Sequence, residues 1–158
     1  MTRGRRGAVA APPDVLELYK VTVEMADRVS ARRGAANQFY LTLQSTLLGV
    51  PAIFSAFGRD EFDPLRATVL AAIGAITSVT WWLQLRSYRD LNAAKFNVIN
   101  RIERDYLPVQ PFSDEWASLK QDPLPKWRPR YAELGFVERF VPVAFLALEL
   151  LIGVTVWL

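Results

Sequence analysis

Residues 67–83 read ATVLAAIGAITSVTWWL, seventeen consecutive positions without an acidic or basic side chain. Two other stretches, residues 39–57 and 140–158, are similarly apolar, and each is nineteen residues long. A bilayer core about 30 Å thick needs roughly 17–25 helical residues at about 1.5 Å per residue. Glu149 is the one charged side chain within the three stretches. The pattern predicts three transmembrane helices, because a small soluble protein would not contain three helices that are apolar on every face.

The sequence around these stretches divides the chain into four parts. Residues 1–13 are small, basic and proline-containing, and we expect a disordered tail. Residues 14–106 are expected to form a helical hairpin that crosses the membrane twice and continues into the cytoplasm. Residues 107–139 form a cytoplasmic, proline-containing segment with a short helix capped by Ser113, and residues 140–158 form the third transmembrane helix. The predicted fold class is all-α, an integral membrane protein with a cytoplasmic extension of its first helical hairpin.

The distribution of basic residues predicts the orientation. Of the 19 lysines and arginines, seven lie in residues 1–38, ten in residues 84–139 and two in the turn, residues 58–66. Cytoplasmic segments retain an excess of Lys and Arg. We therefore expect a multi-pass protein of the cell inner (plasma) membrane, with the N-terminus in the cytoplasm and the C-terminus outside it.

Two rows of residues spaced three and four apart predict that the cytoplasmic extensions pack as an antiparallel pair. The rows are Val15, Leu18, Thr22, Met25 and Val29, and Tyr88, Leu91, Lys95, Val98 and Ile102. Setting Phe39 level with Leu83 brings Asp27 level with Lys95, Arg32 level with Asp90, and Lys20 within one residue of Glu103. These charges either pair across the helices or are unrelated solvated groups, since exposed pairs contribute only roughly 0–1 kcal/mol.

The most informative single residue is Glu149, which lies roughly 14 Å from either end of its span. An ionisable group at that depth should face the bundle interior or a water-filled path. One interpretation is a pore residue, repeated around a symmetric oligomer as a ring that favours cations. The other is a protonated side chain bonded to Gln44, Ser45 or Thr77 of a neighbouring helix. Gln44 and Ser45 are likewise candidates either for lining a path or for holding helices together.

Small residues in the second span predict a helix–helix contact, because they let backbones approach closely in lipid. Ala67, Ala71 and Ala75 recur every four positions, and so do Gly74 and Ser78. Trp81 and Trp82 follow at the end of the span, where an aromatic belt is expected.

Basic residues next to the first two spans are candidates for binding a cytoplasmic ligand, a lipid or a partner. They are Arg32, Arg33, Arg86, Arg89 and Lys95. The cluster at residues 86–89 could bind a nucleotide, a lipid phosphate or a protein, or could simply meet anionic lipid headgroups.

Composition excludes several classes of function. The chain has no cysteine and no histidine, which removes disulfides, thiolate catalysis and the commonest metal ligands. It contains no phosphate-binding glycine loop, paired catalytic carboxylates or nucleophile–base set. We therefore expect no enzyme activity and no metal or other cofactor. Nucleic-acid binding is also not expected, because 17 basic residues are interleaved with 12 acidic ones on the predicted cytoplasmic side.

The segments next to the membrane carry a family resemblance. They read MADRVSARR (residues 25–33), ANQFYLTL (36–43) and WLQLRSYRDLNAAKF (82–96). Over residues 15–105 the chain resembles the SLATT group of small bacterial membrane proteins of conflict and antiviral systems. The resemblance implies a two-helix membrane hairpin and a pore-forming effector that oligomerises in the inner membrane and harms the infected cell when triggered. The third span is a departure from that pattern.

Together these features predict an oligomeric, pore-forming or channel-like membrane effector, closed at rest and gated through its cytoplasmic helices. Its expected partners are the lipid bilayer, further copies of the chain, and a soluble cytoplasmic signalling partner or nucleotide. The alternative is a non-conducting membrane adaptor that docks a soluble partner on its cytoplasmic hairpin. A weaker third hypothesis is a lipid-binding or enzyme-subunit role.

Overall fold

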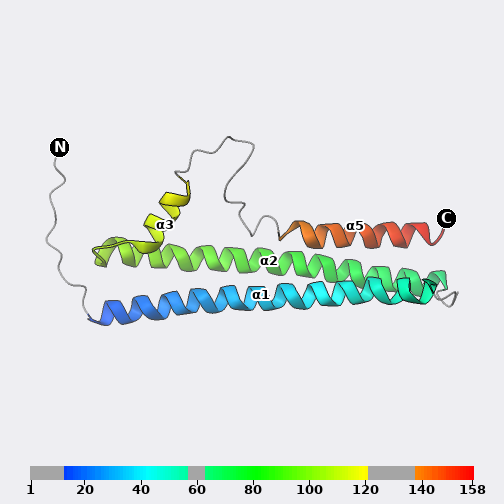
Figure 1. Ribbon diagram of the computed structural model, residues 1–158, viewed down its shortest axis with the longest axis horizontal. Coiled ribbons are helices and arrows are strands. Elements are labelled where there is room, and N and C mark those ends of the chain that lie inside the picture. Colours follow the sequence, from blue (N-terminus) through cyan, green and yellow to red (C-terminus); the bar gives the residue numbers. More distant parts are fainter. Residues whose placement is uncertain (1–12, 57–62, 121–137) are drawn as a thin grey trace. The chain divides into compact units, whose positions relative to one another are not determined.

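The computed structural model describes residues 13–56, 63–120 and 138–158, and these residues form four α-helices and no β-strand (Figure 1). The helices are α1 (Pro13–Ala56), α2 (Pro64–Tyr106), α3 (Pro111–Lys120) and α5 (Phe140–Thr155). The predicted all-α class is confirmed. The predictions for the basic tail, for most of the turn, and for residues 121–137 lie outside the described residues.

The two long helices continue without interruption from the apolar stretches into polar sequence, as predicted. Helix α1 has 44 residues and includes both Gly34 and Pro51, and α2 has 43 residues. Helix α2 ends at Tyr106, two residues before Pro108, which is consistent with the bias of the residue before a proline against the helical conformation.

The described residues fall into two compact units. The first unit contains residues 13–30 of α1, residues 90–106 of α2, and α3. The second contains residues 31–56 of α1, residues 64–89 of α2, and α5 with the two residues before it. Each unit has its own buried apolar residues: Ala26, Val29, Ile99 and Ile102 in the first, and Ala71, Trp81 and Leu85 in the second.

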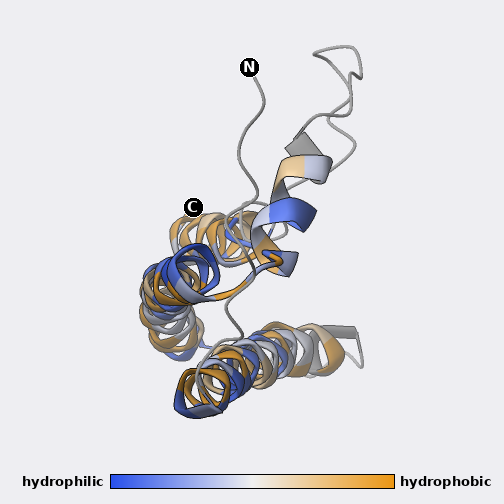
Figure 2. Ribbon diagram, turned by 90° about the vertical axis from the view of Figure 1, so that its left-hand side faces the viewer, coloured by the Kyte–Doolittle hydropathy of each residue, from blue (hydrophilic) through white to orange (hydrophobic). Residues whose placement is uncertain are grey.

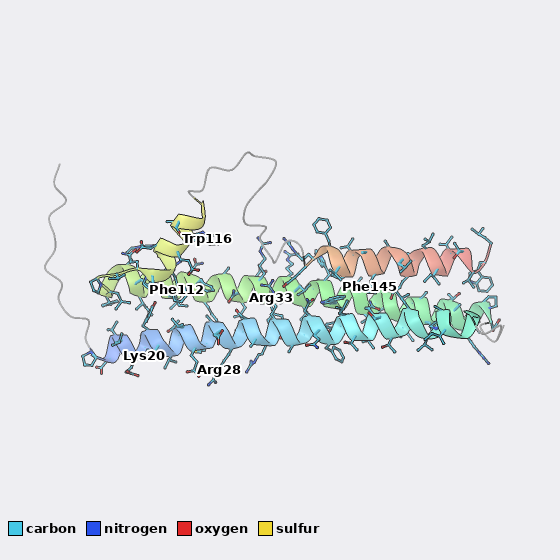
Figure 3. The ribbon with its side chains drawn as sticks, in the orientation of Figure 1. Lys20, Arg28, Arg33, Phe112, Trp116 and Phe145 are labelled. Carbon is cyan, nitrogen blue, oxygen red and sulfur yellow. The ribbon has the colours of Figure 1, made fainter. Side chains whose placement is uncertain are left out.

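A buried carboxylate joins the three helices of the first unit. The Tyr19 hydroxyl group donates to Oε1 of Glu103 at 2.9 Å. The backbone N–H groups of Phe112 and Ser113 donate to the same carboxylate at 3.1 and 3.3 Å. The Phe112 ring also meets the edge of Phe96, with ring centroids 5.6 Å apart (Figure 3). The predicted cap was wrong, because the start of α3 is capped by Glu103 rather than by the Ser113 side chain.

The same contact changes the ionisation of the tyrosine. Burial, followed by the hydrogen bond to Glu103 and the negative charge of that carboxylate, raises the pKa of Tyr19 to about 12. The phenol therefore stays protonated, and keeps donating to the carboxylate, well above the ordinary pKa of a tyrosine.

The predicted antiparallel register of α1 and α2 is confirmed in both units. The Tyr19–Glu103 pair of the first unit and a hydrogen bond from Gln44 to Ser78 in the second both follow the register that sets residue 39 level with residue 83.

The predicted charge pairs across this register were wrong. Lys20 pairs with Glu17 of its own helix at 2.8 Å, and Glu103 receives Tyr19 instead. Among the ion pairs of the described residues there is none that includes Asp27, Lys95, Arg32 or Asp90. Arg28 pairs with Glu24 along α1 and points away from α2 (Figure 3).

The predicted seam of the first unit was half right. Val29 and Ile102 are buried as expected, but Leu18, Met25, Leu91 and Val98 are each about half exposed. The neighbouring positions Tyr19, Ala26 and Ile99 face the partner helix instead. At these three places the contact is therefore made by the residue that follows the predicted one: Tyr19 after Leu18, Ala26 after Met25 and Ile99 after Val98.

In the second unit α5 lies antiparallel to α2. At one end Trp157 Nε1 donates to Thr68 Oγ1 at 2.8 Å. At the other end the rings of Phe145 and Trp81 are 6.1 Å apart (Figure 3). The Trp81 ring also stacks on Tyr40 of α1, at 5.8 Å and 10°.

Trp81 therefore lies between helices rather than in the predicted aromatic belt. It is 1% exposed, and its Nε1 donates to Asn37 Oδ1 at 3.0 Å. Trp82, the next residue along α2, is only half-buried.

Among the described residues, α2 is the one helix with the length and apolar composition to cross a membrane, and α5 is a shorter apolar helix. Hydrophobic residues dominate α5 (Figure 2).

Candidate functional site

The second unit contains a polar cluster that all three of its helices help to build. Gln44 comes from α1, Gly74 and Ser78 from α2, and Glu149 from α5. The Gln44 amide donates to the Gly74 carbonyl oxygen at 3.0 Å and to the Ser78 hydroxyl oxygen. Gln44, Ser78 and Glu149 are only 0%, 1% and 2% exposed. We call these four residues the intramembrane polar cluster.

The Glu149 carboxyl group occupies the space that a side chain at position 74 would fill. A Cβ atom built on Gly74 would overlap all three atoms of that carboxyl group. Glycine at position 74 therefore admits the acid between α2 and α5. One turn further along, Gly153 approaches Ala71, with 3.7 Å between the Ala71 Cβ atom and a Cβ atom built on the glycine.

The cluster is not fully satisfied. Neither oxygen of the Glu149 carboxyl group has a hydrogen-bond partner among the described residues, and the same is true of Gln44 Oε1. Burying an acid without a charged partner or hydrogen bonds is costly. An ionisable residue within a membrane span is a functional candidate for this reason.

The second unit buries polar side chains and exposes large apolar ones. Gln44, Ser78 and Glu149 are buried together with apolar residues, while other large apolar residues face outward on all three helices. Ile76 is 69% exposed, and Leu151 is 59% exposed. Soluble proteins rarely expose so many large apolar side chains. The distribution is typical of a helix bundle surrounded by lipid or by further apolar helices.

The other predicted intramembrane residues lie elsewhere. Ser45 is exposed on α1, and the Thr77 hydroxyl donates to the Ile73 carbonyl oxygen of its own helix at 2.8 Å. Ser45 and Thr77, the other two predicted partners of Glu149, are therefore not part of the intramembrane polar cluster. In the predicted packing row Ala71 is buried, whereas Ala67 and Ala75 are half-buried.

The predicted basic residues do not form one site. Lys95 belongs to the first unit and is half-buried, while Arg32 and Arg89 are exposed in the second unit. Arg33 Nε donates to Glu138 Oε2 at 2.9 Å, and its side chain is only 20% exposed (Figure 3). Arg86 lies over the Trp82 ring at 6.0 Å from the centroid.

Sequence reasoning missed several residues that hold the helices together. Glu103 and Tyr19 join the first unit, Asn37 holds Trp81, and Glu138 pairs with Arg33. The Gly74–Ser78 spacing was a usable signal for the cluster, because it marks the face of α2 that polar side chains from both neighbours approach. Among the described residues there is also no group of acids that could hold a metal ion.

Comparison with protein families identifies the chain. The model of the octameric membrane protein family (8xMP) matches residues 16–158. The chain belongs to this family. No curated protein and no solved structure gave a significant match. Membership in a membrane protein family agrees with the large apolar residues that the second unit exposes. The description of the family also supports a homo-oligomer in lipid. The family found is not the SLATT group that the sequence resembles.

Proposed function

We propose that this protein is an octameric, channel-like membrane effector, closed in the described conformation. The observation that carries the proposal is the intramembrane polar cluster. Eight copies would bring eight unsatisfied carboxyl groups to one level of the bilayer, where rings of acidic side chains favour cations. We infer the number of copies from the description of the family as octameric.

The closed state follows from the burial of Glu149. Its carboxyl group rests on Gly74 between α2 and α5 and is 2% exposed, so it borders no open path within one subunit. We propose that opening separates α5 from α2. Water would then reach Glu149, Gln44 and Ser78, and their free acceptor atoms could solvate a passing cation.

A contact at the edge of the second unit is suited to control this movement. The Arg33–Glu138 ion pair ties α1 to the residues that lead directly into α5. Arg33 stands six residues before the predicted first span, on the cytoplasmic side. A signal that withdraws Arg33 would release the start of α5. This is how we propose that the cytoplasmic helices gate the protein.

The proposed placement is multi-pass in the inner membrane. Within the second unit α1 and α5 both run antiparallel to α2. With the first and middle segments retained by their basic residues, three spans put the N-terminus in the cytoplasm and the C-terminus outside.

A liposome flux assay tests conduction. Glu149→Gln keeps the shape of the side chain, so assembly should persist while cation preference falls. Glu149→Leu should block the path. The matched control is Asp105→Asn, an exposed acid of the first unit, which should change neither property. If both Glu149 variants conduct with unchanged rate and selectivity, the proposed role of the cluster in a pore is wrong.

The same assay tests gating. Arg33→Glu breaks the ion pair and should raise flux through the resting protein, and adding Glu138→Arg should lower it again. Arg32→Glu is the matched control, because Arg32 is exposed and forms no ion pair among the described residues. Equal flux through the wild type and Arg33→Glu would show that this contact does not hold the protein closed.

A second candidate function is a non-conducting adaptor. The observation that favours it is a half-exposed apolar row on α1 and another on α2 within the first unit, Leu18 with Met25 and Leu91 with Val98. Such side chains can dock a soluble signalling partner. If Glu149→Leu raises thermal stability and leaves activity unchanged, the acid is only a buried contact, and the adaptor becomes the better proposal.

The biological role that we propose rests on the SLATT resemblance. Triggered opening in the inner membrane would harm an infected cell and so act in antiviral defence, with no enzyme activity required. Toxicity on expression, lost in Glu149→Leu, is the expected outcome in cells.

A further inference from the structure

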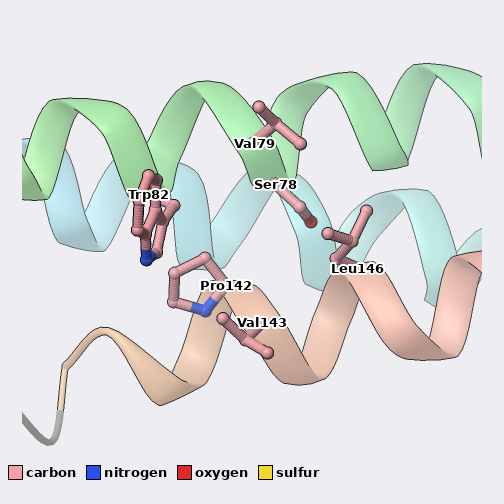
Figure 4. Close-up of a pocket in the computed structure, with 6 residues that line it drawn as sticks. All are labelled: Ser78, Val79, Trp82, Pro142, Val143 and Leu146. Carbon is pink, nitrogen blue, oxygen red and sulfur yellow. The ribbon is translucent and has the colours of Figure 1, made fainter.

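We infer that a groove between α2 and α5 binds one anionic phospholipid on the cytoplasmic side of the membrane. The groove has two adjoining parts, both within the second unit. The deeper part, of about 300 Å³, is lined by Ser78, Val79, Trp82, Pro142, Val143 and Leu146 (Figure 4). The outer part, of about 220 Å³, is lined by Trp82, Arg139, Phe140 and Val143.

The walls of the deeper part suit an acyl chain. Val79, Trp82 and Val143 present hydrocarbon to the groove, and Leu146 extends it one turn further along α5 (Figure 4). Pro142, near the start of α5, is buried and also lines the groove. A groove lined by these side chains offers a flexible hydrocarbon chain apolar contacts along its length.

The outer part supplies charge at one end only. Arg139 lines it immediately before α5 begins. Arg86 lies over the Trp82 ring, one turn beyond the groove on α2. The Arg86 guanidinium group is thus next to Trp82, and Arg139 lines the same outer part as this tryptophan. Arginine recognises phosphate through paired N–H donors, so this end is complementary to an anionic phosphate headgroup.

The depth of the groove agrees with a lipid in its normal position. The predicted cytoplasmic surface lies at residue 83 on α2 and residue 140 on α5. The two arginines are on the aqueous side of that level, and Val79 and Leu146 are on the hydrocarbon side. A bound lipid would thus keep its headgroup at the interface. Its chain would cover Ser78, the member of the intramembrane polar cluster that also lines the groove.

Quenching of tryptophan fluorescence by brominated lipids tests the inference on the full-length protein. Vesicles of phosphatidylcholine receive a small fraction of either brominated phosphatidylglycerol or brominated phosphatidylcholine. Each variant is measured with and without Trp82→Phe, and the difference reports quenching at Trp82. The anionic lipid should quench this signal more than the zwitterionic one. Arg86→Gln and Arg139→Gln should each reduce that preference about fivefold.

Two further variants separate a built groove from general surface attraction. Val143→Phe and Leu146→Phe fill the apolar part from different levels and retain both arginines, so both should lower quenching at Trp82. Arg101→Gln, on α2 in the first unit, is the matched charge control and should have no effect. Equal quenching by the two lipids would overturn the inference. A preference that survives both phenylalanine variants would show headgroup attraction without a groove. No quenching by either lipid would show that no lipid lies next to Trp82 and would also overturn the inference. The test depends on membrane placement and not on conduction, so it can fail or succeed independently of the proposed channel.

Discussion

Replacing Gly74 with alanine is the sharpest test of the intramembrane polar cluster. The added Cβ atom would overlap the Glu149 carboxyl group, and overfilling a packed contact costs about 1–3 kcal/mol. The carboxyl group cannot move away freely, because Glu149 is 2% exposed. Opposing this cost, alanine is favoured over glycine within a helix by about 1 kcal/mol. We expect Gly74→Ala to be less stable than wild type or equal to it.

A second glycine within a helix serves as a control for the difference in helix propensity between glycine and alanine. Gly49 also lies in a helix, and a Cβ atom built on it meets nothing within 4 Å. Gly49→Ala should therefore be neutral or stabilising. The difference in unfolding free energy between the two variants should be about 1–3 kcal/mol, which is the overfilling cost alone. Reversible unfolding in mixed detergent micelles, followed by circular dichroism at constant protein concentration, measures that difference.

A double-mutant cycle identifies the cause. Glu149→Ala removes the group that the new methyl would meet, so Gly74→Ala should cost nothing in that background. The coupling free energy between positions 74 and 149 should then equal the difference of about 1–3 kcal/mol expected between Gly74→Ala and Gly49→Ala. If Gly74→Ala and Gly49→Ala change stability equally, or if the cycle shows no coupling, Glu149 does not rest on Gly74 and the description of the cluster is wrong.

Three other outcomes are expected. The pKa of Tyr19 is raised to about 12, so its contribution to stability is complete below pH 10 and lost as pH rises from about 10 to about 12; Tyr19→Phe should remove this alkaline loss in pH-dependent unfolding. Arg33→Glu should lower the free energy of unfolding by about 1.5–3 kcal/mol, and adding Glu138→Arg should recover part of that loss. In a double-mutant cycle, Asp27→Lys and Lys95→Asp should show a coupling free energy near zero. Reporter fusions should give a cytoplasmic signal only at the N-terminus; a cytoplasmic signal at both ends would contradict three spans.

The sequence was sufficient to predict the helices and their register, because both depend on simple spacing. Uncharged stretches of membrane length are visible directly, and the continuation of the spans into amphipathic sequence predicts two long helices. With residues 39 and 83 set level, Tyr19 is level with Glu103 and Gln44 is level with Ser78, and the structure shows both pairs in contact. The register was predicted, but these two contacts were not, because the sequence paired Glu103 with Lys20.

The choice of contacting side chains was harder to predict. Leu18 and Tyr19, or Val98 and Ile99, lie on neighbouring faces of a helix, and apolar spacing does not tell which face meets the partner within the chain. In an oligomeric family both faces of a helix can be apolar, one for the contact within the chain and one for contacts with lipid or other copies. The structure places Tyr19 and Ile99, rather than Leu18 and Val98, at the contact within the chain.

The candidate site was predicted in part. An acid at mid-span stands out in any apolar sequence, so Glu149 was identifiable, and Gln44 was one of its expected neighbours. Its contact with Gly74 was not predictable, since it depends on how α5 is aligned along α2. No feature of residues 140–158 fixes that alignment until the contacts of Trp157 and Gly153 are known.

The capping of α3 by Glu103 means that docking and folding of this helix are a single event. With ten residues, α3 is too short to be stable in water on its own. Its first free N–H groups are satisfied by a side chain of another helix, so the helix loses its start when it leaves that surface. A protease or hydrogen-exchange experiment should therefore find no detached but helical α3. The segment is either docked and protected or released and unwound, and amide exchange at Phe112 and Ser113 reports which state is populated.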